Sequence, residues 1–421
     1  MLRIIICAAV LCVAPGLYAI DRESGSLIAE RLAQVIEDNY VEPDTGREIA
    51  ALLREGTWAA RDESRLASRF TELLKPFDGH FSVRFRPPGP AVIEAEAGAV
   101  DYAGAIRRRN YGFQQVEILR GNIGYIDLRE FAAAEAAGPT AAGAMQFVAN
   151  AHALIFDLRR NGGGDPAMVQ LLCSYLIEPG VLLNSLYWRP SNQTSQFWTL
   201  PVVPGARLID KPVYVLIGAR TGSAAEEFAY NLRALERGTL VGRTTYGAAN
   251  PGQDMDLGGG WSVFVSTGKA INPITGSNWE GSGVEPHVDV SESSALRQAH
   301  ELALGAELAR NEDELAQQQL EWALDYLRAA QSPVAVSALE TLTGHYGDRT
   351  ISFEDGRLWY RRGERMAEAL VAASPVLFYL ESSDTLRVRF DADGRSASRF
   401  TEESYDGFFR SFERADRAEA Q

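Results

Sequence analysis

Ser223, between a predicted strand and a predicted helix, is the leading candidate for a residue that carries out chemistry. Residues 213–217 (VYVLI) are apolar and β-branched, as in a buried strand, and a helical pattern starts directly after Ser223. At such a turn the hydroxyl is presented outward, and the amides of the first helical turn lack partners within the helix. These features suit an alcohol nucleophile in acyl transfer.

The same serine also has a purely structural interpretation. Ser223 and Glu226 have the spacing of a capping box, in which the hydroxyl accepts an amide hydrogen bond and the glutamate accepts another in return. From this segment alone, the helix cap is the favoured interpretation. The nucleophile hypothesis therefore depends on residues elsewhere in the chain.

A glycine-rich loop follows another predicted strand. Residues 162–167 (GGGDPA) fit the G-x-G-x-x-A pattern of a dinucleotide site. However, Asp165 places negative charge where a pyrophosphate would need helix amides, and residues 186–188 offer no acid for a ribose. No Gly-Lys-Ser/Thr follows, which excludes a phosphate-binding P-loop. Two interpretations remain open: amides that stabilise an oxyanion, or a flexible tight turn.

One histidine could supply the base that a serine nucleophile needs. His80 follows the turn signal Asp78-Gly79, and alternating apolar residues after it predict a short strand. Imidazole titrates near neutral pH and suits general base catalysis. An isolated histidine is more often a structural residue, so this alternative stays open.

Composition narrows the class of protein. The 421 residues carry a net charge of −15, which disfavours nucleic acid as a partner, and the length predicts two or three domains. We expect no metal site, because no pair of the remaining histidines has zinc-ligand spacing. These are His152, His287, His300 and His345.

The first 19 residues have the pattern of a signal peptide. A basic start is followed by an apolar run at 4–13 and a small residue, Ala19, that suits cleavage. The sequence therefore predicts an exported protein, periplasmic or secreted, with an uncleaved anchor as the alternative and no membrane span in the mature chain. Cys173 would be the only cysteine left after cleavage, so no disulfide is expected, and its apolar surroundings predict a core residue.

Strands alternate with helices over the middle of the chain, which predicts an α/β core with a mixed, mainly parallel sheet. Helix formers dominate before it, and short strands with turns follow it. We predict a signal peptide at 1–19, a helical subdomain at 20–90, the α/β core at 91–290, a helical linker at 291–332 and an antiparallel β domain at 333–421.

Several blocks of the sequence together resemble the C-terminal processing, or tail-specific, serine peptidases. The blocks are 153–166, 214–232, 240–252 and 271–290, in this order. The last block and residues 187–201 are similar to the branch of interphotoreceptor retinoid-binding protein repeats, and residues 78–83 (DGHFSV) resemble the histidine motif of the tricorn-like branch. The resemblance covers about residues 25–290 and implies a crotonase/Clp-like peptidase core.

The resemblance implies a role for each matching residue of the predicted nucleophile region. Ser223 matches the nucleophile of the family. The amides of Ala224 and of Gly163 or Gly164 match its oxyanion hole. In the best-known branch a lysine is the general base, but the matching residue here is Ala248, so a Ser–Lys dyad is not available.

In the tricorn-like branch the base is a histidine that matches His80, supported by a glutamate that matches Glu280. The family places a serine directly before the histidine, whereas this chain has Gly79. The relay from His80 to Glu280 is therefore direct, water-mediated or absent.

The resemblance implies a peptide or protein substrate and a serine endopeptidase without a cofactor. Only residues 86–100 are available for a peptide-binding PDZ insertion, which is too short, so the aromatic loop with Trp188 and Trp198 is the candidate substrate contact. Ordinary loop packing is the alternative for that loop. A non-catalytic protein that binds an apolar ligand or a peptide on the same scaffold is the second hypothesis, and a dinucleotide enzyme a distant third. The sequence leaves the oligomeric state open.

Overall fold

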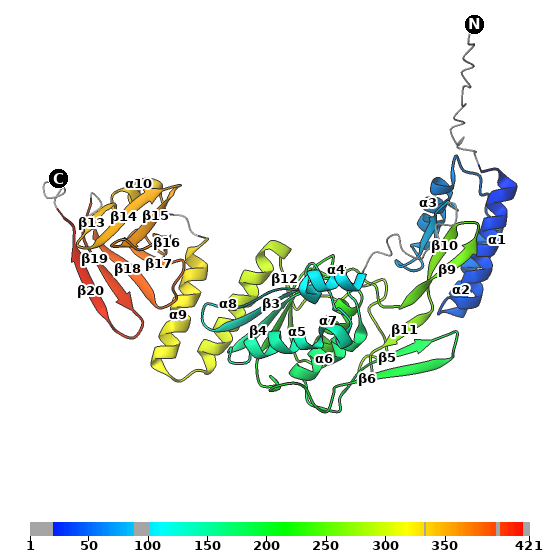
Figure 1. Ribbon diagram of the computed structural model, residues 1–421, viewed down its shortest axis with the longest axis horizontal. Helices are drawn as coiled ribbons and strands as arrows, with labels where there is room; N and C mark the ends of the chain where they lie inside the picture. The colour runs from blue at the N-terminus through cyan, green and yellow to red at the C-terminus, as the bar shows by residue number, and fades with distance from the viewer. Residues whose placement is uncertain (1–19, 88–101, 332–333, 393–395, 416–421) are drawn as a thin grey trace, which may run out of the picture. The chain divides into compact units, whose positions relative to one another are not determined.

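The computed structural model describes residues 20–87, 102–331, 334–392 and 396–415 (Figure 1). The predicted signal peptide, 1–19, lies outside these residues. Contacts divide the chain into two units. The first unit comprises Met1–Ala105, Leu182–Trp198 and Tyr246–Gly283, and the second comprises the rest. This division does not follow the predicted segments, because strands far apart in the sequence pair within the first unit.

The first unit begins with three amphipathic helices, in agreement with the helical pattern of this region. They are α1 (Arg22–Asn39), α2 (Pro43–Glu55) and α3 (Glu63–Leu74). The strand β1 (Ser82–Phe85) pairs with β10 (Trp261–Ser266), which forms a hairpin with β9 (Gly252–Gly258). The apolar faces of the helices and of β10 share one core. Residues around 80 and residues around 265 therefore belong to one structure.

A second small sheet of the first unit contains residues 182–188, which fall within the α/β core predicted at 91–290. The strand β5 (Leu182–Trp188) pairs with β6 (Gln193–Trp198) and β11 (Gly268–Ile271), and both pairings are antiparallel. Asn192, at a φ of 49°, helps the chain to turn back between β5 and β6. This strand is thus part of a hairpin and not of the central sheet.

The central sheet belongs to the second unit and confirms the predicted mixed, mainly parallel architecture. Its order is β12-β8-β7-β4-β3-β2, and every pairing is parallel except that of β2 with β3. The strands are β2 (Phe113–Leu119), β3 (Ile123–Leu128), β4 (Ala153–Asp157), β7 (Val213–Ile217), β8 (Thr239–Gly242) and β12 (Val288–Asp289).

Helices cover both faces of this sheet (Figure 1). On one face lie α5 (Ala134–Phe147), α6 (Pro166–Leu176) and α7 (Ala224–Ala234), and the rings of Phe156 and Phe228 pack there at 5.2 Å. Cys173 lies buried in α6, as predicted. The short α4 (Tyr102–Arg108) and the 3-10 turn Asn110–Gly112 precede β2.

The predicted helical linker is two helices, α8 (Glu292–Arg310) and α9 (Glu314–Ala329). The Asp313 side chain caps the N-terminus of α9, so a second helix begins there. Ala295, Ala299 and Ala303 of α8 pack on the face of the central sheet opposite to α5, α6 and α7. This helix therefore belongs to the core rather than to a linker.

The C-terminal region is an antiparallel β structure, as predicted. Eight strands follow one another in sequence order, and a bridge between Tyr346 and Arg414 joins the first to the last. The sequence Asp355-Gly356 is typical of a hairpin turn, and both residues have positive φ in such a turn. Residues 393–394, with the same Asp-Gly pattern, lie outside the described residues. The elements are α10 (Val336–Glu340), β13 (Gly344–Tyr346), β14 (Arg349–Glu354), β15 (Arg357–Arg362), β16 (Glu368–Ala372), β17 (Leu377–Leu380), β18 (Leu386–Ala392), β19 (Ala397–Ser404) and β20 (Phe409–Glu413).

Aromatic contacts join this β structure to α9. The ring of Trp322 lies 6.2 Å from that of Tyr379, and Arg120 Nη1 donates to the carbonyl of Ser383 at 2.6 Å. Among the described residues, no helix combines the length and the apolar character needed to cross a membrane.

Candidate functional site

Ser223 stands on a strained turn between β7 and α7. Its φ of 53° and ψ of −123° lie in a region that L-residues rarely adopt. The residues that cap other helices, such as Asp165 and Ser291, have extended backbones, and their side chains accept helix amides. Such strain costs about 1–3 kcal/mol and concentrates at functional sites. The backbone of Ser223 therefore differs from that of an ordinary cap.

A buried carboxylate holds this turn in place. The amide of Ser223 donates to Glu226 Oε2 at 2.8 Å, which is the glutamate half of the predicted capping box. Thr245 Oγ1 donates to Glu226 Oε1 at 2.5 Å and accepts from the amide of Val284 at 2.7 Å. Glu226 and Thr245 are buried. This support from Thr245 was not predicted, because it comes from a different segment of the chain.

The glycine-rich loop lies directly against Ser223. A methyl group on Gly163, which has a φ of 112°, would lie 2.6 Å from Ser223 Cβ and 3.0 Å from the amide nitrogen of Ala224. Only glycine fits this position. Asn161 fixes the approach: its carbonyl accepts from the amide of Gly222 at 3.0 Å, and its Oδ1 accepts from the amide of Gly163 at 2.9 Å. The structure thus brings together the predicted nucleophile and the predicted oxyanion loop.

The predicted oxyanion amides differ in their availability. The amide of Gly163 donates to Asn161, whereas the amides of Gly164 and Ala224 have no acceptor among the described residues. Phe131 holds the loop, because its amide donates to the Gly163 carbonyl at 2.9 Å and its carbonyl accepts from the Asp165 amide at 2.7 Å. Gly164 and Ala224 are therefore the amides that could bind an oxyanion.

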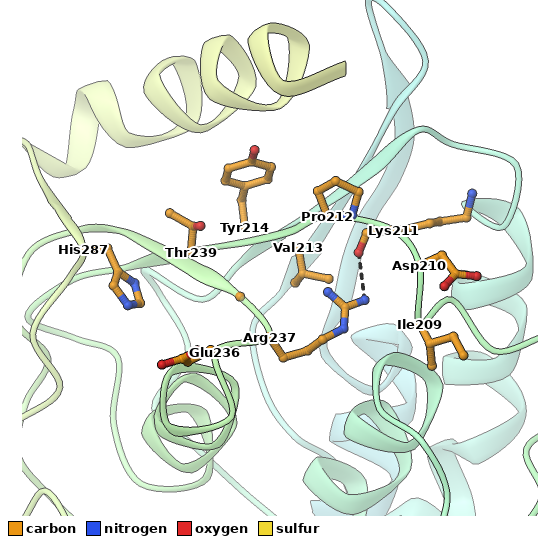
Figure 2. A pocket seen from close by; sticks show the side chains of 11 residues that line it. Ile209, Asp210, Lys211, Pro212, Val213, Tyr214, Glu236, Arg237, Thr239 and His287 are labelled. Atoms are coloured by element: carbon orange, nitrogen blue, oxygen red, sulfur yellow. Dashed lines mark hydrogen bonds between the residues drawn. The ribbon is translucent and has the colours of Figure 1, made fainter. Parts of the chain in front are cut away.

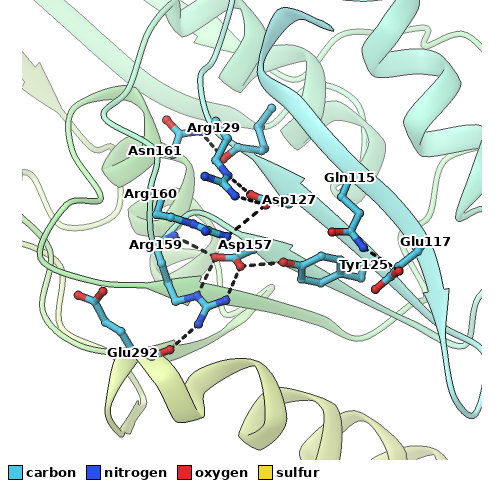
Figure 3. A network of polar contacts seen from close by, with 11 residues as sticks. Gln115, Glu117, Tyr125, Asp127, Arg129, Asp157, Arg159, Arg160, Asn161 and Glu292 are labelled. Carbon is cyan, nitrogen blue, oxygen red and sulfur yellow. Dashed lines mark hydrogen bonds and ion pairs between the residues drawn. The ribbon is translucent and has the colours of Figure 1, made fainter. Parts of the chain in front are cut away.

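A charged network fixes the strand ends before this loop (Figure 3). Asp157, at the end of β4, accepts from Arg159 Nε at 2.9 Å and from the Tyr125 hydroxyl at 2.8 Å. Burial opposes ionisation of Asp157, but these hydrogen bonds and the Arg159 charge hold the pKa of its carboxyl below the usual value. Arg159 also contacts the carbonyl of Glu292, whose Oε1 accepts from the amide of Ala219 at 2.9 Å. The network therefore supports the residues just before Ser223.

A second cluster, which we call the His80 cluster, consists of Asp78, His80 and Glu280 in the first unit. His80 Nδ1 lies 3.1 Å from Asp78 Oδ1 and 3.8 Å from Glu280 Oε2. The amides of Ala249 and Asn250 donate to Glu280 Oε2 at 2.8 and 2.9 Å. The structure thus places the predicted partners His80 and Glu280 together, and adds a nearer carboxylate.

Electrostatics distinguish the two carboxylates. Burial and the charge of Asp78 raise the pKa of Glu280 to about 7. Burial opposes ionisation of Asp78, but hydrogen bonds from the ring and the amide of His80 keep its pKa below the usual value. Asp78 therefore carries the charge beside His80, while Glu280 holds a proton readily. The sequence offered one signal for Asp78, its position two residues before the histidine, but that pattern was interpreted as a turn alone.

The remaining site residues lie as follows. Ser223 belongs to the second unit and His80 to the first. Ala248, at the position of the family's lysine, is buried, and its carbonyl accepts from Trp279 Nε1 at 3.2 Å. Trp188 pairs with Gln193 and Trp198 with Leu182, so the tryptophans lie at opposite ends of a hairpin, about 20 Å apart. They do not form one compact substrate contact.

A pocket of about 570 Å³ lies at the amino ends of β7 and β8 (Figure 2). Ser223 follows the carboxyl end of β7, so this pocket is at the other end of the strand. Arg237 lines it and donates to the carbonyls of Leu176 and Lys211 at 2.6 and 2.7 Å. The imidazole of His287 accepts from the amide of Leu240 at 2.9 Å. These groups hold the chain together, and the pocket is not the site of the predicted chemistry.

Fold and site define an α/β protein with a serine on a strained strand-to-helix turn, next to a glycine-rich loop. Residues 122–290 match the family model for Peptidase family S41. This match confirms the resemblance of that stretch to the tail-specific serine peptidases.

Individual relatives are more distant. A carboxyl-terminal-processing peptidase 1 of Arabidopsis thaliana, a chloroplastic protein, is 29% identical over 179 residues, which are 42% of this chain and 35% of that protein. The chain thus aligns with only about a third of that curated relative. The solved photosystem II D1 C-terminal processing protease is 15% identical, with 64% of this chain and 94% of that chain covered and a TM-score of 0.41. The tricorn protease is also 15% identical, with coverages of 65% and 35% and a TM-score of 0.38.

Proposed function

We propose that this chain is an exported serine endopeptidase that hydrolyses peptide bonds through an acyl-enzyme. The observation that carries the proposal is the strained backbone of Ser223, which lies against Gly163 in the stretch that matches Peptidase family S41. A helix cap does not need this conformation, since Asp165 and Ser291 cap with extended backbones.

In the proposed reaction, His80 accepts the proton of the Ser223 hydroxyl as its oxygen attacks a peptide carbonyl. The amides of Gly164 and Ala224 stabilise the oxyanion, and His80 then donates the proton to the leaving amine. Water then attacks the acyl-enzyme, with His80 again accepting the proton and returning it to Ser223, and the acyl group is released. With Nδ1 directed at Asp78 and Glu280, Nε2 is the nitrogen for this transfer, and the reaction requires the two units to bring it to Ser223.

Ser223→Ala tests the proposal directly. We expect loss of hydrolysis of denatured protein and loss of labelling by a serine-directed phosphonate. The matched control is Ser64→Ala, which removes an exposed hydroxyl of α3 and should change neither readout. Labelling and hydrolysis that persist in Ser223→Ala would refute the proposal.

Export is tested by the mature N-terminus. If residues 1–19 are a signal peptide, the protein recovered from the periplasm or medium starts at Ile20, as N-terminal sequencing would show. Recovery of the chain in the cytoplasm with Met1 in place would contradict export and leave the hydrolytic proposal unchanged.

The second candidate is a non-catalytic protein for an apolar ligand or a peptide. The absence of the family's lysine, replaced by Ala248, favours it. Mass spectrometry of the purified protein distinguishes the two: a co-purified lipid, together with no hydrolysis and no phosphonate labelling, would support the carrier.

A further inference from the structure

We propose that the His80 cluster is a site for a divalent transition metal ion, with Zn²⁺ as the reference ion. We further propose that occupancy of this site switches off the hydrolytic reaction. The switch rests on the function proposed above, whereas binding of the metal does not. The argument uses only residues of the first unit.

The cluster offers a suitable set of donors. One imidazole nitrogen and two carboxylates converge, and their candidate ligand atoms all lie within 4.8 Å of one another. Zinc prefers histidine nitrogen and carboxylate oxygen among the ligands available here, and sites with three protein ligands keep a fourth position open. The donors come from two distant parts of the chain, Asp78 with His80 and Glu280, so folding of the first unit creates the site.

The spacing agrees with tetrahedral coordination. Bonds of about 2.1 Å to a tetrahedral ion place two ligand atoms about 3.4 Å apart. The observed distances from His80 Nδ1 to Asp78 Oδ1 and Glu280 Oε2 are 3.1 and 3.8 Å, on either side of this value. Only small side-chain adjustments are needed to admit the ion.

Two buried oxygens of the cluster have no hydrogen bond. Among the described residues, Asp78 Oδ2 and Glu280 Oε1 are buried without a partner, and Asp78 is only 3% exposed. An unsatisfied buried polar group is costly, and native structures seldom retain one without a reason. A bound cation would supply the missing partner for both oxygens.

The other oxygen of each carboxylate already accepts hydrogen bonds from backbone amides. Glu280 Oε2 accepts the amides of Ala249 and Asn250, and Asp78 Oδ1 accepts the amide of His80 at 2.8 Å. Such outer contacts orient metal ligands before the ion arrives. Each carboxylate can therefore hold the ion through the oxygen nearer to His80 Nδ1, through its unpartnered oxygen, or through both.

Metal binding and base catalysis need opposite tautomers of His80. In the proposed reaction Nδ1 carries the hydrogen and Nε2 accepts the proton of Ser223. Coordination through Nδ1 uses its lone pair, so the neutral ring carries its hydrogen on Nε2. That nitrogen then has no lone pair for the serine proton, and hydrolysis stops until the ion leaves.

Calorimetric titration of the full chain with ZnCl₂ tests the site, with Co²⁺ absorption as a second readout of tetrahedral ligation. Ser223→Ala should bind like the wild type, whereas Asp78→Asn and Glu280→Gln should each lose about tenfold or more in affinity. His345→Gln, which replaces an exposed histidine of β13, is the matched control and should bind normally. Circular dichroism checks that each variant is folded.

Zinc should inhibit hydrolysis by the wild type and by His345→Gln at similar concentrations, and EDTA should restore it. This result would support the switch. Absence of binding by the intact chain, or binding that Asp78→Asn and Glu280→Gln both leave unchanged, would overturn the site. Binding without inhibition of a measurable hydrolysis would overturn the switch. Failure of the peptidase proposal would show as absent hydrolysis in metal-free protein, while the titrations still decide the site.

Discussion

The Ser223 turn and the His80 cluster are built by different physical means. The turn is held by neutral backbone geometry and short-range contacts of the strand-to-helix connection, with one buried glutamate beneath it. The cluster is held by charge, with two carboxylates and an imidazole, and its members are separated by about half the chain. One part depends on strain and the other on electrostatics.

This difference teaches which changes each part tolerates. A strained turn is sensitive to the volume and φ preference of its residues, and hardly to pH. A buried charged cluster keeps its shape when a carboxylate becomes an amide, but its protonation changes at once. Substitutions chosen by these criteria should affect one part without the other.

The largest expected effect follows from Ser223→Gly. Hydrolysis should fall by several orders of magnitude, on the order of the millionfold loss typical of a removed nucleophile. The unfolding free energy should rise by about 1 kcal/mol, because glycine adopts a φ of 53° without strain. Steady-state kinetics and urea unfolding measure the two. A loss of stability would show that the turn is not strained.

The second effect tests the electrostatic part. His80→Ala should lower kcat by roughly a hundredfold to ten-thousandfold with little change in KM, because a proton carrier is lost while the binding surface remains. Asp78→Asn should lower kcat more than Glu280→Gln, since Asp78 is the nearer carboxylate at 3.1 Å and stays ionised. The reverse order of the two amide variants would assign the orienting role to Glu280.

A third test breaks the Ser223 turn through its neighbour. Gly163→Ala puts a methyl group 2.6 Å from Ser223 Cβ at a φ of 112°, so we expect a loss of about 2–4 kcal/mol in unfolding free energy and little remaining hydrolysis. Gly162→Ala is the matched control, because its methyl group would meet no atom within 4 Å. Equal stability of both variants would contradict the close approach of loop and serine.

Removal of the support under the turn should have a smaller effect. Thr245→Val keeps the volume but deletes the hydrogen bonds to Glu226 and from Val284, which should cost about 1–3 kcal/mol. Thr245→Ser restores the hydroxyl and should recover most of the loss. Thermal unfolding of the three proteins provides the measurement. A valine variant as stable as the wild type would show that Glu226 holds Ser223 without this support.

The smallest effect sharpens the contrast between two imidazoles. His300 is buried in α8, where burial lowers its pKa although a hydrogen bond with the carbonyl of Arg120 and the charge of Glu301 oppose the shift. A lowered folded-state pKa means that the unfolded chain takes up the proton first. Stability is therefore complete above pH 6.5 and declines as the pH falls below it, by at most about 1.4 kcal/mol per unit.

Unfolding of the wild type and His300→Gln at pH 7.5 and 5.5 measures this difference. The variant should lose less stability between the two values than the wild type does. An equal loss in both proteins would assign the acid sensitivity to other groups.

The sequence predicted what local pattern determines. β7 has the predicted limits, because a β-branched run between turns defines a buried strand. The nucleophile hypothesis relied on the same local signals, and the structure confirms the strand and the helix on either side of Ser223. That Ser223 is the nucleophile remains a prediction.

Features that depend on which segments of the chain pair with each other could not be predicted from the sequence. The sequence around Leu186 is compatible with a strand of the central sheet or of the small sheet, and only its pairing with β6 and β11 places it in the small sheet. The sequence predicts a linker at α8, because its alanines give a weak apolar face that is recognised only when it meets the sheet. Asp78 likewise has the pattern of a turn residue, since its contact with His80 depends on the side-chain rotamer.

The first unit is assembled from three separate stretches of chain, and the last of them ends at Gly283. Proteins emerge from the ribosome from the N-terminus onward and fold domain by domain. His80 thus leaves the ribosome long before Glu280, and the imidazole meets its full set of carboxylates only after about two thirds of the 421 residues have been made. The His80 cluster of a nascent chain is therefore incomplete until Glu280 has been made.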